Sequence, residues 1–167
     1  MRDYVFRGKP KNKNDYYFFS QSWKESCKDG FVYGSLVISK NKDYGDRYYI
    51  CVTALCSINS CVNNGTTSMI EVIPETVGQY TGITDKNGKK IFGGDILKWQ
   101  MYIKDTEEKL KNILTRIDEV VYKHTSFQMK NNSCSMCVCD DMDTLEVIGS
   151  IHDNPELLEQ TQNKFTS

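Results

Sequence analysis

The dipeptide Asn87-Gly88 lies between two short apolar segments that begin at Ile83 and end at Phe92. Asn and Gly tolerate positive φ angles, so this arrangement predicts a tight β-hairpin with a bulge. Gly93-Gly94-Asp95 predicts a second turn, and the apolar residues from Ile96 to Trp99 predict another short strand. Local chemistry alone therefore requires antiparallel strands in the middle of the chain.

Further strands are predicted on both sides of this hairpin. They are rich in aromatic and β-branched residues and are bounded by Asn, Asp, Gly or Pro, which is the composition of strands. The segments are Tyr16–Phe19, Phe31–Ile38, Arg47–Leu55, Met69–Ile73 and Leu145–Ile151. The chain is therefore expected to be mainly β, at the margin of α+β. We expect its antiparallel strands to form a small, barrel-like arrangement with one or two short helices.

Two segments favour helices. Leu110, Ile113, Leu114 and Ile117 fall on one helical face, and Asp105 with Glu108 has the spacing of a capping box, which predicts a helix over Asp105–Leu114. Asn154 followed by Pro155 predicts a helix start, with Asn154 as the N-cap. Residues 115–123 fit either a longer helix through Val121 or a strand that turns at Lys123–Thr125 into Ser126–Met129.

Length and charge limit the remaining possibilities. With 167 residues we expect a single domain over residues 1–167, large enough to bury a core. The net charge of -1 excludes any argument for a nucleic-acid partner from bulk charge. Arg2, Arg7 and Lys9 leave no room for the apolar core of a signal peptide, so we expect a cytoplasmic protein with no membrane partner.

The seven cysteines are expected to be reduced thiols, because an odd number cannot all pair within one molecule. Two clusters invite a zinc hypothesis, because a CxxC run is a common half-site; they comprise Cys51, Cys56 and Cys61, and Cys134, Cys137 and Cys139. No second CxxC follows, and cysteine also serves as a small apolar residue in strands. We therefore predict no metal and no cofactor, although the sequence leaves metal binding by these six residues open.

No catalytic motif stands out. Neither His124 nor His152 lies beside a Cys or Ser at a spacing that suggests a nucleophile and its base. Asp85 and Asp95 could serve as an acid–base pair in a hydrolase if one carboxyl were desolvated. The lysines around them would instead keep both ionised, so an enzyme is not expected.

Charge is distributed unevenly along the chain. Residues 1–28 hold seven basic and three acidic residues, whereas residues 140–159 hold seven acidic and no basic residues. The two ends could pair within or between subunits, or each could meet its own partner. The basic end is interleaved with aromatic residues, so a nucleic-acid-binding β surface is the alternative hypothesis. Its candidate contacts are Arg2, Arg7, Lys9, Lys11 and Lys13.

Four segments, in order, resemble the YopX family of phage and prophage proteins: Arg2–Lys9, Phe31–Gly34, Thr76–Ile96 and Glu146–Leu158. Gly93 departs from the family, which usually has an acidic residue before Gly-Asp-Ile. The resemblance implies a small β-rich phage or prophage accessory protein in a bacterial host, with no established reaction. We therefore expect a non-enzymatic macromolecular interaction module, a homo-oligomer whose protein partner is unknown.

The residues that carry this resemblance can each be explained by a structural role: they permit a turn, relieve backbone crowding, or cap a helix. We predict a structural motif made of Gly78, Thr81, Gly82, Asp85, Asn87, Gly88, Gly94, Asp95, Gly149, Asn154 and Pro155.

Overall fold

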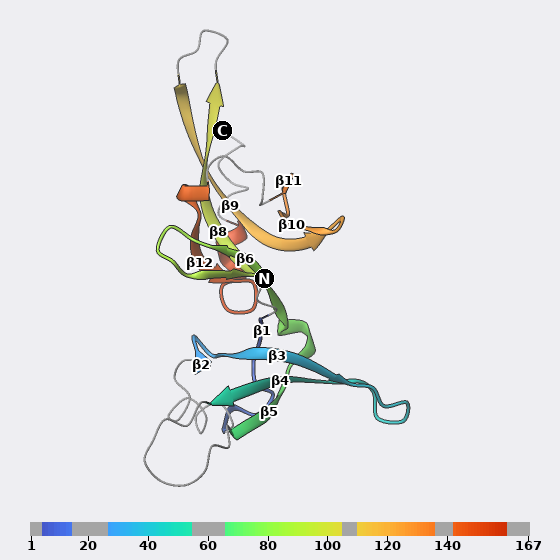
Figure 1. The fold of residues 1–167 in the computed structure, drawn as a ribbon. Coiled ribbons are helices and arrows are strands. Elements are labelled where there is room, and N and C mark those ends of the chain that lie inside the picture. Colours follow the sequence, from blue (N-terminus) through green and yellow to red (C-terminus); the bar gives the residue numbers. More distant parts are fainter. Residues whose placement is uncertain (1–4, 15–26, 55–65, 105–109, 136–141, 160–167) are drawn as a thin grey trace, which may run out of the picture. The chain divides into compact units, whose positions relative to one another are not determined.

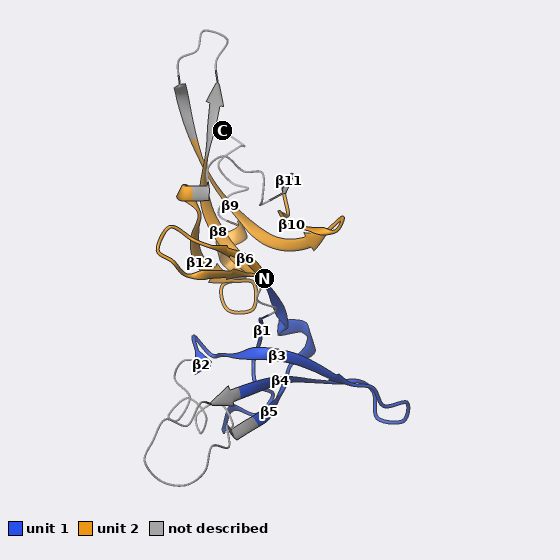
Figure 2. Cartoon of the chain, in the orientation of Figure 1, with its two compact units in different colours: residues 1–80 blue, residues 81–167 orange. Residues whose placement is uncertain are grey.

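The computed structural model describes residues 5–14, 27–54, 66–104, 110–135 and 142–159. The chain forms two compact units, residues 1–80 and residues 81–167 (Figure 2). Strand β6 (Gly78–Thr84) runs from the first unit into the second. The prediction of one domain over the whole chain stays a prediction.

Unit 1 is an antiparallel sheet in the order β5-β4-β3-β1-β6, with β2 also paired to β3 (Figure 1). Its elements are β1 (Phe6–Gly8), β2 (Cys27–Lys28), β3 (Phe31–Ser39), β4 (Arg47–Ala54), β5 (Thr66–Val72) and the 3-10 turn η1 (Pro74–Thr76). One face of the sheet forms the core, which contains Cys27, Val32, Ile50, Val52, Ile70 and Val72. Strand alternation accounts for this set, because Leu36, Ile50 and Ile70 lie side by side on β3, β4 and β5.

Unit 2 contains a five-stranded antiparallel sheet in the order β11-β10-β9-β8-β12, and β7 pairs with β6. The elements are β7 (Lys90–Phe92), β8 (Asp95–Lys104), β9 (Leu110–Lys123), β10 (Ser126–Met129), β11 (Asn132–Ser135), η2 (Met142–Thr144), β12 (Glu146–Ser150) and η3 (Pro155–Leu158). A second core contains Ile91, Leu97, Trp99, Val120, Met129 and Leu145. Each unit therefore has an apolar core of its own.

The prediction of a mainly β, antiparallel protein is confirmed. The strands predicted at Phe31–Ile38, Arg47–Leu55 and Met69–Ile73 are β3, β4 and β5. In the described residues the strands form open sheets rather than a closed barrel, and η1, η2 and η3 are short 3-10 turns. The strand predicted at Tyr16–Phe19 lies outside the described residues.

The predicted helix over Asp105–Leu114 is wrong from Leu110 onward, and the capping-box residues Asp105 and Glu108 lie outside the described residues. β9 begins at Leu110 and pairs with β8 along most of its length, from Leu110 opposite Lys104 to Glu119 opposite Ile96. This long pairing outweighs the local helical period, since tertiary contacts routinely override propensity. For residues 115–123 the strand alternative is correct, and β9 turns at His124-Thr125 into β10.

Candidate functional site

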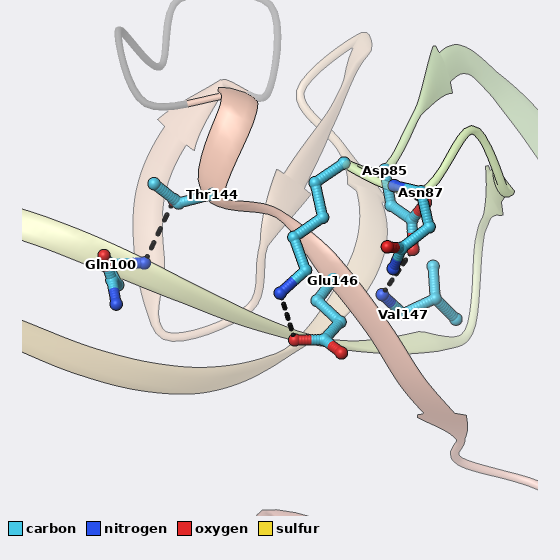
Figure 3. A network of polar contacts seen from close by, with 7 residues as sticks. Asp85, Asn87, Gln100, Thr144, Glu146 and Val147 are labelled. Atoms are coloured by element: carbon cyan, nitrogen blue, oxygen red, sulfur yellow. Dashed lines mark hydrogen bonds and ion pairs between the residues drawn. The ribbon is translucent and has the colours of Figure 1, made fainter.

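The Asp85 carboxylate organises the predicted hairpin and ties it to another strand (Figure 3). Its Oδ1 atom accepts the backbone N–H groups of Asn87, at 2.8 Å, and Lys89, at 2.9 Å. Its Oδ2 atom accepts the N–H of Val147 in β12, at 3.1 Å. The Gly88 N–H donates to the Asp85 carbonyl, and Gly88 has a φ of 79°. The predicted hairpin with a bulge is confirmed, and it is held by a buried side chain.

The residue after Asp85 extends this connection. The Lys86 backbone N–H donates to the Leu145 carbonyl at 2.9 Å, and its Nζ lies 2.7 Å from the Glu146 Oε2 atom. The ion pair is largely exposed and therefore contributes little by itself. Together, Asp85 and Lys86 occupy backbone groups of β12 and of the residue before it. The turn thus pairs with β12, the last strand of the five-stranded sheet, as a neighbouring strand would.

The environment of Asp85 opposes proton transfer. Burial by itself raises the pKa of the carboxyl, but the N–H groups of Val147, Lys89 and Asn87 more than offset burial, so the pKa lies below its ordinary value. A carboxylate held by three N–H donors remains ionised near neutral pH. Asp85 is therefore suited to fixing backbone and is a poor general acid.

We expect the stabilising effect of Asp85 to depend on pH. Because its pKa is lower in the folded state than the unfolded value of about 3.9, its contribution is complete above that value and is lost as pH falls through the folded-state pKa. Urea unfolding of the natural protein and of Asp85→Asn between pH 6 and pH 3 measures this. The stability advantage of the natural protein should shrink below about pH 4, and an advantage that stays constant down to pH 3 would contradict the prediction.

Asp95 is also built into a turn. It is 1% exposed, and its Oδ2 accepts the Phe92 N–H at 2.8 Å. Beside it, Gly94 donates its N–H to the Val120 carbonyl at 2.8 Å and accepts the Ile151 N–H at 3.0 Å. The turn before β8 therefore connects β9 with the segment after β12. These contacts assign Asp95, like Asp85, to the architecture of unit 2.

The other motif residues of β6 lie in the backbone network. Thr81 is buried and donates its hydroxyl to the Ile91 carbonyl at 2.9 Å, which fastens β6 to β7. Gly78 is paired with Arg7 of β1, and Gly82 has a φ of 93°.

Gly149, Asn154 and Pro155 form the closing turn. A Cβ atom on Gly149 would lie 2.8 Å from the Asn154 Oδ1 and 3.0 Å from Leu157 Cδ1, so a larger residue would push η3 away. Pro155 begins η3 and Asn154 is its N-cap residue, as predicted, but the Asn154 side chain makes no cap hydrogen bond. Instead, the Leu157 N–H donates to the Asn154 carbonyl at 3.1 Å. Asn154 uses its side chain to pack against Gly149.

One buried polar pair was missed by the sequence analysis. Trp99 Nε1 donates to Asp118 Oδ2 at 3.0 Å, and the two residues are 4% and 2% exposed. A signal was present, because Asp118 has the same strand parity as the core residue Val120. An acidic residue on the core side of a strand calls for a buried donor.

The five candidate nucleic-acid contacts have different environments. Arg7 is 4% exposed and its guanidinium carbon lies 4.4 Å from the centre of the Phe31 ring, while Lys9 Nζ lies 5.3 Å from that centre. Lys11 forms a 2.8 Å ion pair with Glu71. Lys13 is exposed, and Arg2 lies outside the described residues. Arg7 therefore stabilises the interior of unit 1 through a cation–π contact.

The candidate metal residues are only partly described. Cys51 lies in β4 and Cys134 in β11, whereas Cys56, Cys61, Cys137 and Cys139 fall outside the described residues. In the part of the chain that the structure describes, no three His, Cys, Asp or Glu residues come together as a metal site. Nor does that part contain a helix long and apolar enough to cross a membrane.

The outward side of β3, β4 and β5 carries an apolar surface that we call the outer face: Val37, Tyr49, Cys51 and Met69. Val37 is opposite Tyr49, and Cys51 is opposite Met69, so the four side chains lie on one side of three adjacent strands. Val37 is 37% exposed and Met69 is 52% exposed. Polar groups beside the outer face include Glu71, which lies opposite Tyr49.

Glu71 lies between two cations. Its hydrogen bond with Lys11 is the main cause that lowers its pKa, and Arg47 acts in the same direction. A hydrogen bond with Tyr49 raises the pKa of Arg47. The outer face therefore has an apolar centre and, at Lys11, Glu71 and Arg47, a charged border with one net positive charge.

Comparison with known proteins supplies the family. The family described as YopX protein matches residues 5–159. The chain belongs to the YopX family. The match runs through both units and includes every motif residue from Gly78 to Pro155, so the resemblance read from the sequence is confirmed.

This YopX-family chain is also similar to a solved structure, "Crystal structure of protein EF1440 from Enterococcus faecalis". The two share 22% sequence identity, the alignment covers 74% of this chain and 87% of that one, and the TM-score is 0.40. No curated protein matches the chain.

Proposed function

We propose that this YopX-family chain is a phage or prophage accessory protein that acts without catalysis, by binding another protein through the outer face of unit 1. The observation that carries this proposal is the exposure of Val37 and Met69 on β3 and β5, on either side of the half-buried Tyr49 and Cys51 of β4. Protein interfaces commonly combine an apolar centre with a polar border. The border here favours a partner surface with an acidic group.

The motif residues support the non-catalytic part of the proposal. Asp85 and Asp95, the two carboxylates considered for hydrolysis, accept backbone N–H groups in turns. The nucleic-acid alternative receives less support, because Arg7 is buried against Phe31 and Lys11 is bound to Glu71. To neutralise a phosphate, Arg7 would have to leave the Phe31 ring and Lys11 would have to leave the Glu71 carboxylate.

The test is an affinity pull-down from the lysate of a bacterial host that carries the phage or prophage, run with and without nuclease. Met69→Lys places a charge on the outer face, and Tyr122→Lys places the same charge at a 64% exposed position in unit 2. The natural protein and Tyr122→Lys should capture the same amount of a nuclease-resistant partner protein. Met69→Lys should capture at least about tenfold less of that partner. Equal capture by Met69→Lys would overturn the proposal, and a signal removed by nuclease would favour the nucleic-acid alternative.

A further inference from the structure

Among the described residues, half of β3 pairs with a strand on one side only. Residues 35–39 pair with β4, from Ser35 opposite Cys51 to Ser39 opposite Arg47. On the other side, β1 pairs with β3 only from Val32 to Gly34. β2 pairs with Phe31 and Val32 from the side opposite β1, because Val32 is paired with both Gly8 and Cys27. Among the described residues no strand pairs with residues 35–39 on the β1 side, and Figure 1 shows this half of β3 extending beside β4. We call residues 35–39 the open edge.

The sequence of the open edge lacks the usual protection of such edges. It reads Ser-Leu-Val-Ile-Ser, with no charge, no proline and no glycine. Edge strands exposed to water commonly carry Lys, Pro or a bulge, because their free N–H and C=O groups can pair with another chain. Val37 and Ile38 point to opposite sides of the sheet, and they are 37% and 43% exposed. Consecutive apolar residues of this kind are typical of strands covered on both faces.

The open edge is also complementary to itself. In an antiparallel pair centred on Val37, Ser35 faces Ser39, Leu36 faces Ile38, and Val37 faces its own counterpart. This register uses the five residues of β3 with which no described residue pairs on the β1 side, and it places no charge opposite another. The two-fold symmetry of such a pair is the commonest symmetry of protein dimers.

We infer that two copies of this chain associate through their open edges, forming one continuous sheet in which β3 of one protomer is antiparallel to β3 of its partner. Main-chain hydrogen bonds join the two copies, as in other cases of strand addition. Leu36 and Ile38 then extend the inner layer that contains Ile50 and Ile70, while the two Val37 side chains meet on the outer side. The inference does not rest on the proposed protein partner, because the purified chain alone forms this contact.

The test is the oligomeric state of the purified full chain under reducing conditions, measured by sedimentation equilibrium. We expect a dimer at about 50 μM protein, corresponding to a micromolar or tighter dissociation constant. Val37→Lys places two like charges opposite each other at the symmetry axis and should raise that constant at least about tenfold. Met69→Lys adds the same charge two strands away, and its dimer should be unchanged.

Three results would overturn the inference: a monomeric natural protein at that concentration, dimers of Val37→Lys equal to those of the natural protein, or equal dissociation by Met69→Lys. Circular dichroism shows whether Val37→Lys is folded. If it is not, Val37→Cys provides the measurement, because residues directly opposite on antiparallel strands are close enough for a disulfide. Mild oxidation should give more covalent dimer with Val37→Cys than with the natural protein or Met69→Cys, and equal amounts would overturn the inference.

Discussion

Asp85→Ala should lower the free energy of unfolding of this YopX-family protein by about 2–4 kcal/mol, because hydrogen bonds to charged groups are strong and buried donors are costly to leave unpaired. The substitution removes the acceptor for the N–H groups of Asn87, Lys89 and Val147. Water can reach the exposed turn and replace part of the loss at Asn87 and Lys89. The loss at Val147 separates the hairpin from β12.

Asp85→Asn is the sharper comparison. The amide keeps one oxygen for the Asn87 and Lys89 N–H groups, but it presents an NH₂ group to the Val147 N–H. We therefore expect roughly half of the loss caused by alanine. Asp143→Ala, which removes an exposed carboxylate from the same unit, should change stability by less than about 0.5 kcal/mol.

Urea unfolding followed by circular dichroism and tryptophan fluorescence gives these values. If Asp85→Ala and Asp143→Ala behave alike, the Asp85 network does not stabilise the fold and the residue becomes available for another role. If Asp85→Ala is folded but loses a measured activity, the structural assignment of the motif is wrong.

The Asp85 turn also shows how far sequence reasoning reaches. Asn87-Gly88 and the adjacent apolar residues predict the hairpin because all of the information is local. The bond from Val147 to Asp85 joins residues that are 62 positions apart, and no local pattern encodes it. The hairpin could be predicted from the sequence, but β12, the second strand that Asp85 binds, could not be named.

The helix error has the opposite origin. A helical period is met by chance in the spacing of Leu110, Ile113, Leu114 and Ile117, whereas the pairing of β9 with β8 decides the conformation.

Arg7 illustrates a similar limit in reading charge from the sequence. Arginine near a basic, aromatic terminus suggests a surface contact, yet the flat guanidinium stacks on Phe31 inside unit 1. Long-range pairing and side-chain stacking are the two kinds of information that the sequence patterns lack.

The close approach of β3 and β4 at Gly34 leads to the last prediction. A Cβ atom on Gly34 would overlap the backbone carbonyl oxygen of Cys51, and it would lie 3.1 Å from the Ile50 Cγ2 atom. A flexible side chain could move aside, but a carbonyl in a strand moves only if the two strands separate. Gly34→Ala should therefore lower the free energy of unfolding by at least about 3 kcal/mol, at the upper end of the cost of overpacking.

Ser35→Ala provides the matched control, because it places alanine at the next, exposed position of the same strand and should change stability by less than about 0.5 kcal/mol. Urea unfolding compares the two variants, and hydrogen exchange locates the damage. The loss of protection against hydrogen exchange should be greatest in peptides from β3 and β4, because Ile50, which lies next to Gly34, belongs to the core of unit 1. A loss below about 1 kcal/mol for Gly34→Ala would mean that β3 and β4 can separate locally at little cost. In that case the rigid register that holds the outer face and the open edge would not exist as described.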